Sequence, residues 1–287
     1  MTPIEGDLAT LYRGPDGVLK LARDPADNDL IIREAAALNW LAAHGEPTYL
    51  PYVPTLLGTG GYRDPATSKV RRGNALTPLD GFRDLAFIAP RFPAGLDPRD
   101  VAWIWRRLLV ALGFAHRSGI VHGAVLPPHV LIETGQHGLT LVDWCYATGG
   151  PQPGPLPAIP AAYRDWYPPE VRSGYVPEPG LDIYLGTKCM LQLINPKDPP
   201  DPLTTFGKGC LLANPRRRPD DAWALLSELD GVLERAYGPR RFRPFPALDG
   251  CESAACRARR KHGPPGLPQR RHHPGSRPEP PASHFCT

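Results

Sequence analysis

The sequence predicts an α+β fold with two lobes, a small β-rich N-terminal lobe that holds one helix and a larger, mainly helical C-terminal lobe. Two observations predict this arrangement. Short strand-like runs with one helical stretch among them fill about residues 1–90, and helical patterns dominate from about residue 97. At 287 residues, 41% of them hydrophobic, the chain is also long enough to build a sizeable core.

The N-terminal elements follow from turn residues and apolar periodicity. Residues from about 3 to 22 are expected to form short strands around a turn at 13–17, with Lys20 in the middle of the last strand. Helical spacing predicts a helix from Asp29 to about Ala43. Residues 59–81 are rich in Gly, Thr, Arg and Asp and are expected to form an irregular insertion around a strand. Residues 85–90 are predicted to be a buried strand, stopped by Pro90.

The C-terminal elements begin with a strong helix signal. Asp97 and Pro98 combine an N-cap residue with a proline in the first helical position, so a helix is predicted to run to about Arg117. Short strands are expected at 130–132 and 139–142, a loop at 149–160, and helices at 181–194 and 219–235. One domain therefore spans residues 1–238, with its lobes at about 1–90 and 91–238.

Residues 239–287 differ from this domain in composition. They carry ten basic and three acidic residues, a net charge of +7, whereas residues 1–238 carry 23 basic and 26 acidic residues, a net charge of −3. Their Pro/Arg-rich sequence predicts a disordered tail, which is a candidate to bind an acidic partner although a solvated extension without a fixed partner is the simpler interpretation. The mildly acidic domain is not expected to bind nucleic acid.

Cysteine usage and the absence of long apolar runs bear on the compartment. The six cysteines are few and scattered, which predicts a reducing, cytoplasmic environment, although Cys251 and Cys256 followed by His262, His272 and His273 leave a zinc site as a minor alternative. The N-terminal residues do not form a secretory signal, and no apolar run is long enough to predict a membrane span.

Several spaced motifs resemble the eukaryotic-type Ser/Thr protein kinase family between about residues 3 and 235. His122, Gly123 and Ala124 lie where the family has His-Arg-Asp, and His129 lies where an Asn follows after four further residues. The resemblance implies that Lys20 is the strand lysine that pairs the nucleotide phosphates and that Glu34 is its helical partner. It also implies that Asp143, in Asp-Trp-Cys, is the metal-binding aspartate of the Asp-Phe-Gly motif.

Three later motifs resemble segments that build the large lobe of the family. Residues 167–170 resemble the Ala-Pro-Glu motif, residues 182–186 resemble Asp-Val-Tyr-Ser-Leu-Gly, and residues 214–219 resemble the late Asp-Pro-x-x-Arg-Pro motif. The resemblance implies that Arg218 pairs with Glu170 and that Asp182 braces the backbone near His122. These roles are structural and support a fold more than an activity.

The departures from the family predict lost chemistry. Ala124 replaces the catalytic base, His129 replaces the metal-binding Asn, and Cys145 replaces the hinge Gly. Of the three glycines of the phosphate loop only Gly6 remains. The sequence therefore predicts a pseudokinase that acts as a regulator or scaffold, with a protein partner, and that binds ATP and Mg²⁺ weakly or not at all through Lys20, Glu34, Gly6 and Asp143.

Two alternatives stay open at this point. The first is an active Ser/Thr protein kinase with a non-standard catalytic loop and a protein substrate, because phosphoryl transfer depends largely on positioning and charge stabilisation. The second is a relative of the small-molecule phosphotransferases, because the His-Gly pair at 122–123 resembles the His-Gly-Asp loop of the aminoglycoside phosphotransferases, in which Ala124 again takes the Asp position.

Overall fold

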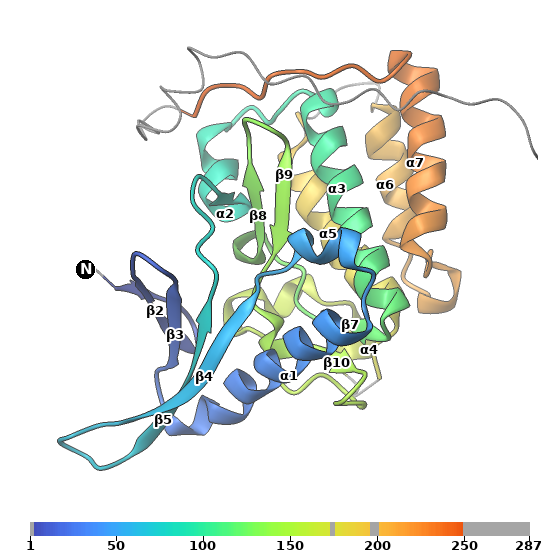
Figure 1. The fold of residues 1–287 in the computed structure, drawn as a ribbon. Coiled ribbons are helices and arrows are strands. Elements are labelled where there is room, and N and C mark those ends of the chain that lie inside the picture. The colour runs from blue at the N-terminus through green and yellow to red at the C-terminus, as the bar shows by residue number, and fades with distance from the viewer. Residues whose placement is uncertain (1–2, 173–175, 196–200, 249–287) are drawn as a thin grey trace, which may run out of the picture. The chain divides into compact units, whose positions relative to one another are not determined.

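The computed structural model describes residues 3–172, 176–195 and 201–248 and places them in two lobes (Figure 1). The N-terminal lobe is built on a five-stranded antiparallel sheet with the spatial order β1-β2-β3-β5-β4. Its strands are Ile4–Glu5 (β1), Ala9–Arg13 (β2), Val18–Ala22 (β3), Leu56–Arg63 (β4) and Val70–Leu76 (β5). Gly14 and Gly17 close the predicted turn between β2 and β3 with a backbone hydrogen bond of 2.8 Å.

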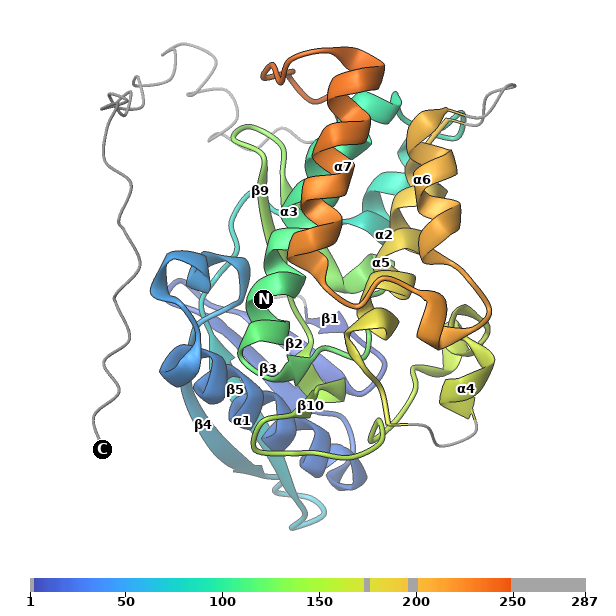
Figure 2. The same cartoon turned by 90° about the vertical axis from the view of Figure 1, so that its right-hand side faces the viewer.

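One long helix, Asn28–His44 (α1), packs against the sheet, and Figure 2 shows it lying across one face. Its buried side chains recur at spacings of three and four residues, which gives a single apolar stripe facing the strands. Glu34 lies on this buried stripe and is itself fully buried. The helix ends at Gly45, where a Cβ would come within 2.4 Å of the Phe114 ring, so the close approach of the C-terminal lobe requires glycine at this position.

Two N-terminal predictions differ from the structure. The stretch expected to be an irregular insertion around one strand is a regular hairpin of β4 and β5 with a tip at residues 64–69. Residues 85–88, expected to be a strand, form the short helix Leu85–Ile88 (α2). The side chain of Asp84 accepts a hydrogen bond of 2.7 Å from the Phe87 amide, and this N-cap selects a helical turn for an apolar run whose periodicity was ambiguous.

The C-terminal lobe is organised around the helix Pro98–Arg117 (α3), which begins at the predicted Asp97 cap and packs against two further helices. The remaining helices are Pro169–Arg172 (α4), Pro179–Leu193 (α5), Pro202–Cys210 (α6) and Ala222–Tyr237 (α7). The remaining strands are Ile120–Val121 (β7), Thr148–Gly149 (β10), and the antiparallel set Arg83–Asp84 (β6), Val130–Glu133 (β8) and Gly138–Leu141 (β9). Within the described ranges, no helix is long and apolar enough to cross a bilayer.

The first ten residues of the segment assigned to the tail lie on the C-terminal lobe, so the ordered body extends past the predicted boundary at residue 238. Arg243 pairs with the buried carboxylate of Asp100 at 2.6 Å, and its carbonyl oxygen lies 2.9 Å from His137 Nε2. Phe245 packs edge-on against Trp103. We call residues 239–248 the C-terminal strap. Phe242, which stacks on His137, Phe245, and the pair of Arg243 with the buried Asp100 carboxylate hold it, whereas average composition had predicted disorder. The rest of the tail, with the zinc-site candidates, lies outside the described residues.

Removing the strap is expected to destabilise the body, because Asp100 would keep a buried carboxylate without its arginine partner. A chain that ends after Gly238 should lose about 2–4 kcal/mol of unfolding free energy. A chain that ends after Leu248 keeps the strap and should melt like the full chain. Thermal unfolding followed by circular dichroism compares the three proteins, and equal melting temperatures would show that the strap contributes nothing.

Candidate functional site

The candidate site gathers charged side chains around Lys20, which β3 holds between α1 and the loop after β9. Lys20 Nζ lies 2.9 Å from Glu34 Oε1 and 3.1 Å from Cys145 Sγ, and it also contacts Asp143 Oδ1. An ammonium group has three N–H donors, so these three acceptors use all of them. The structure thus brings together Lys20, Glu34 and Asp143, the three residues that the sequence resemblance had grouped.

Asp143 is held on both of its carboxylate oxygens by basic side chains. Oδ1 contacts Lys20, and Oδ2 lies 3.0 Å from His129 Nε2. Its backbone adopts the left-handed conformation, with φ of 66°, which is uncommon for a residue other than glycine. Burial favours the neutral acid, but the charges of Lys20 and His129 outweigh it and hold the pKa of Asp143 well below its usual range. The carboxylate is therefore ionised and fully engaged.

His129 contacts the loop on one side and Asp143 on the other. Its Nδ1 lies 2.8 Å from the carbonyl oxygen of Ala124, and its Nε2 lies 3.0 Å from Asp143 Oδ2. The imidazole therefore fills the space between the Ala124 loop and the second oxygen of Asp143.

Glu34 is anchored from a second side by Asn74, a residue that the sequence did not single out. Asn74 lies directly opposite Lys20 in the β3–β5 ladder and donates 2.9 Å hydrogen bonds to Glu34 Oε2 and to the Ile31 carbonyl. Opposite residues in neighbouring strands project to the same face, so the register itself aims Lys20 and Asn74 at α1. Only the strand pairing, and no local motif, could have revealed this contact.

The protonation states of the central groups follow from this packing. Burial disfavours the charged form of Lys20, but the carboxylate of Asp143 leads the opposing interactions, which raise the pKa of Lys20 well above its usual range. Burial raises the pKa of the Cys145 thiol, which therefore stays protonated beside the ammonium.

The loop around Ala124 is closed by its own hydrogen bonds. Ala124 is fully buried, its amide donates to His122 Nδ1 at 3.2 Å, and the opposite ring nitrogen, Nε2, donates to the Val142 carbonyl at 3.0 Å. Asp182 accepts from the amides of His122 and Gly123 at 2.7 and 2.8 Å, which is the bracing contact that the resemblance implied. The position expected to hold a catalytic base is thus occupied by a methyl group packed in the core.

The predicted pair between Arg218 and Glu170 forms in the C-terminal lobe, between α4 and the turn before α7. The Arg218 guanidinium contacts the Glu170 carboxylate and also donates to the carbonyls of Leu212 and Ala213, at 2.5 and 3.1 Å. The arginine side chain is almost fully buried. This cluster links α4 to the turn before α7, and it shares no contact with Lys20.

Comparison with known proteins supports the architecture. No family model matches the chain, and no curated protein matches it. Among solved structures, the crystal structure of the PknI kinase domain from Mycobacterium tuberculosis is similar, with a TM-score of 0.57 and 18% sequence identity. The match covers 79% of this chain and 92% of that one. The chain has a protein-kinase-like fold.

Within this kinase-like fold, Gly6 has a local reason to be glycine. It opens the turn between β1 and β2, where its amide donates to the Ala9 carbonyl at 2.9 Å. A Cβ on Gly6 would lie 2.8 Å from that same oxygen. Leu8 in the same turn is buried against the core. The geometry of a tight hairpin therefore explains the glycine without a phosphate ligand.

The kinase-like fold implies a magnesium ion at Asp143, and the residues present do not fit one. Glu34, Asp143 and Cys145 place their ligand atoms within 4.8 Å of one another, but all three point at Lys20 Nζ. A thiol is a soft ligand, whereas magnesium requires hard oxygen donors in near-octahedral geometry. The second oxygen of Asp143 lies 3.0 Å from His129 Nε2, so a metal ion there would have to displace the imidazole.

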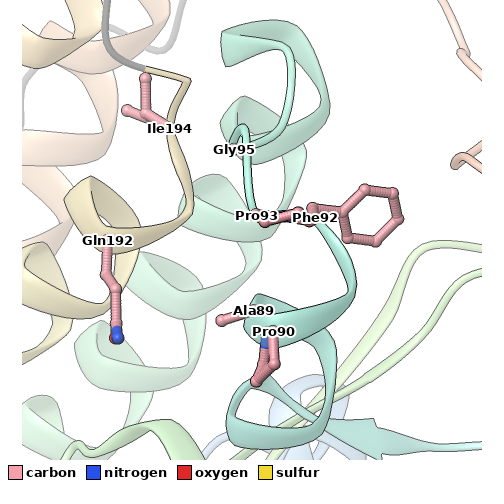
Figure 3. Close-up of a pocket in the computed structure, with 7 residues that line it drawn as sticks. All are labelled: Ala89, Pro90, Phe92, Pro93, Gly95, Gln192 and Ile194. Carbon is pink, nitrogen blue, oxygen red and sulfur yellow. The ribbon is translucent and has the colours of Figure 1, made fainter.

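The kinase-like fold also has a shallow hollow of about 290 Å³ on the C-terminal lobe (Figure 3). Residues between Ala89 and Gly95, together with Gln192 and Ile194 at the end of α5, line it. Gln192 carries the one polar side chain of this lining, and none of the side chains is titratable. The hollow therefore offers hydrogen bonding by one side-chain amide but no group for acid–base or nucleophilic chemistry.

The buried His122 is expected to make stability depend on pH. Burial lowers its pKa from 6.5 to about 4, so the unfolded chain binds a proton between these values that the folded chain does not. Unfolding free energy should therefore fall by about 3 kcal/mol as pH drops from 6.5 to 4. Urea titrations across this pH range should show the fall in unfolding free energy for the native protein and a smaller fall for His122→Gln. An equal dependence of unfolding free energy on pH in both proteins would contradict the role given to His122.

Proposed function

We propose that this chain is a pseudokinase, a protein-kinase-like domain that serves as a regulator or scaffold instead of transferring phosphate. One observation carries the proposal: the charged groups expected to hold nucleotide and metal are saturated by one another. Lys20 has no free N–H donor, and each carboxylate oxygen of Asp143 already contacts Lys20 or His129. A phosphate or a metal ion would have to break contacts that the cluster already makes.

The remaining departures point in the same direction. Ala124 cannot accept a proton, and loss of a general base lowers rates by about 10²–10⁴-fold. Cys145 adds a third acceptor to Lys20 at the position where the resemblance places a glycine. ATP can then bind only weakly, by opening the cluster. We assign the protein a reducing, cytoplasmic setting, which suits the three buried free thiols of Cys145, Cys189 and Cys210.

Phosphotransfer assays test the proposal. The full chain is incubated with labelled ATP and Mg²⁺ or Mn²⁺, alone, with casein as a general protein acceptor, and with kanamycin as a small-molecule acceptor. Asp143→Asn is the matched control, because it removes the charge while keeping the side-chain shape. The assay must detect activity about 10⁴-fold below that of an active kinase, which is the span that a missing base explains.

The expected result is incorporation no higher than in the Asp143→Asn control under every condition. Label on the protein itself or on casein that Asp143→Asn abolishes would favour an active kinase with a non-standard loop. Label on kanamycin that the same control abolishes would favour a small-molecule phosphotransferase. Either outcome would overturn the pseudokinase assignment.

A further inference from the structure

The outer edge of the N-terminal sheet is unusually open. β4 is the last strand of the sheet, and no strand pairs with its outer side among the described residues. Residues 57–63 are all exposed, Leu57 and Tyr62 to 53% and 45%, so neither face of this strand is covered. Strand edges of this length normally carry protecting charges, prolines or covering elements, because free N–H and C=O groups readily pair with another strand.

The composition of β4 leaves room for an approaching backbone. A Cβ added to Gly58 or Gly60 would have no neighbouring atom within 4 Å, and one added to Gly61 would meet only the Val70 side chain, from the neighbouring strand. Glycine inside a strand weakens it and is common where another backbone comes close. The one charge on the strand, Arg63, lies at its end.

Hydrogen bonds from side chains also hold the β4–β5 hairpin in place. At its tip the Asp64 side chain accepts from the amides of Ala66 and Thr67 at 2.8 and 3.0 Å, and Arg63 donates to the Ser68 carbonyl at 2.8 Å. Just after the tip, the Asn28 side chain bonds to Val70 and Arg72 backbone groups, which fixes the first residues of β5 to the start of α1. The open strand thus projects on a braced hairpin (Figure 1).

The net charge of the β4–β5 hairpin indicates which kind of strand can pair with β4. Residues 56–76 carry four basic side chains and one acidic one, a net charge of +3, on a domain whose net charge is −3. Pairing β4 with β4 of a second copy would bring two such hairpins together, and residues 239–287 are themselves basic at +7. A second copy and the chain's own tail are therefore disfavoured by repulsion.

We propose that the β4 edge accepts an extended acidic segment of a partner protein as a sixth strand of the sheet. Backbone hydrogen bonds to β4 supply the attachment, and Arg63, Lys69 and Arg72 supply the preference for acidic side chains. The inference stands whether or not the chain transfers phosphate, because none of these residues belongs to the Lys20 cluster.

Hydrogen exchange with mass spectrometry tests it on the full chain. The probes are three synthetic peptides of equal length, with alternating Glu and Val, Lys and Val, or Glu and Pro. The first can pair and carries negative charge, the second can pair but carries positive charge, and the third keeps the negative charge but lacks an N–H donor at every proline. The Glu-Val peptide at saturation should slow amide exchange in residues 57–63 by about tenfold or more, and the other two should not.

Two variants complete the test. Arg63→Glu/Lys69→Glu/Arg72→Glu should lose the protection, whereas Arg216→Glu/Arg217→Glu/Arg235→Glu changes the net charge equally at exposed sites outside the hairpin and should keep it. Equal protection by the Glu-Pro peptide would show electrostatic attraction without strand pairing and would overturn the proposal. Equal protection by the Lys-Val peptide, or no protection by any peptide, would overturn it as well.

Discussion

Lys20→Met is expected to lower the unfolding free energy by about 3–5 kcal/mol, the cost of removing one partner from a buried ion pair. The ammonium stands between two carboxylates in a nearly closed environment, with side-chain exposures of 7% for Lys20 and 1% for Glu34. Its loss leaves Glu34 and Asp143 facing each other with only His129 to compensate. Urea unfolding monitored by tryptophan fluorescence measures the change.

The control for this variant is Lys69→Met, which removes the same charge from an exposed site on the hairpin and should change stability by less than about 0.5 kcal/mol. The double variant Lys20→Met/Glu34→Gln removes the stranded anion and should recover at least about 1 kcal/mol relative to Lys20→Met. A loss below about 1 kcal/mol in Lys20→Met would mean that the cluster contributes little to folding.

His129→Asn is expected to create magnesium dependence that the native chain lacks. The substitution removes the imidazole beside Asp143 Oδ2 and places an amide oxygen within reach of the same site. Binding of nucleotide at a tenfold excess over its dissociation constant stabilises a protein by about 1.4 kcal/mol. The melting temperature of His129→Asn in the presence of ATP should therefore rise by about 3–5 °C when Mg²⁺ is added. His129→Gln is the control, since its longer side chain moves the amide oxygen away from that position; an equal rise in both variants would show that the oxygen's placement is irrelevant.

Most of the fold could be predicted because its elements carry local signals. The Asp97–Pro98 start of α3 and the turn at residues 13–17 are examples. β4 could not be found in this way, because a strand exposed on both faces has no alternation of apolar and polar residues. The helix α6 carried a usable signal, since Asp201 and Pro202 repeat the cap that begins α3. The strap was hidden in a proline-rich sequence whose average composition masks two anchoring aromatic residues.

The sequence predicted which residues meet at the candidate site but not that they bind one another and leave no group open. The resemblance brought Lys20, Glu34 and Asp143 together across 123 residues of chain, which no local pattern could do. The contacts of His129 with Asp143 and of Cys145 with Lys20, at 3.0 and 3.1 Å, depend on side-chain positions that sequence spacing does not encode. His129 and Cys145, which in the sequence look like separate departures from the kinase motifs, belong to one network around Lys20 and Asp143 in the folded chain.

The most direct test of this closed network is isothermal titration calorimetry of the native full chain with ATP, in the presence of Mg²⁺ and in the presence of a chelator. The account predicts weak binding or none, with the same affinity in both conditions, because neither oxygen of Asp143 is open to a metal ion. Binding that strengthens by about tenfold or more with Mg²⁺ would contradict it, since that gain of about 1.4 kcal/mol requires a metal held by the protein and the nucleotide together.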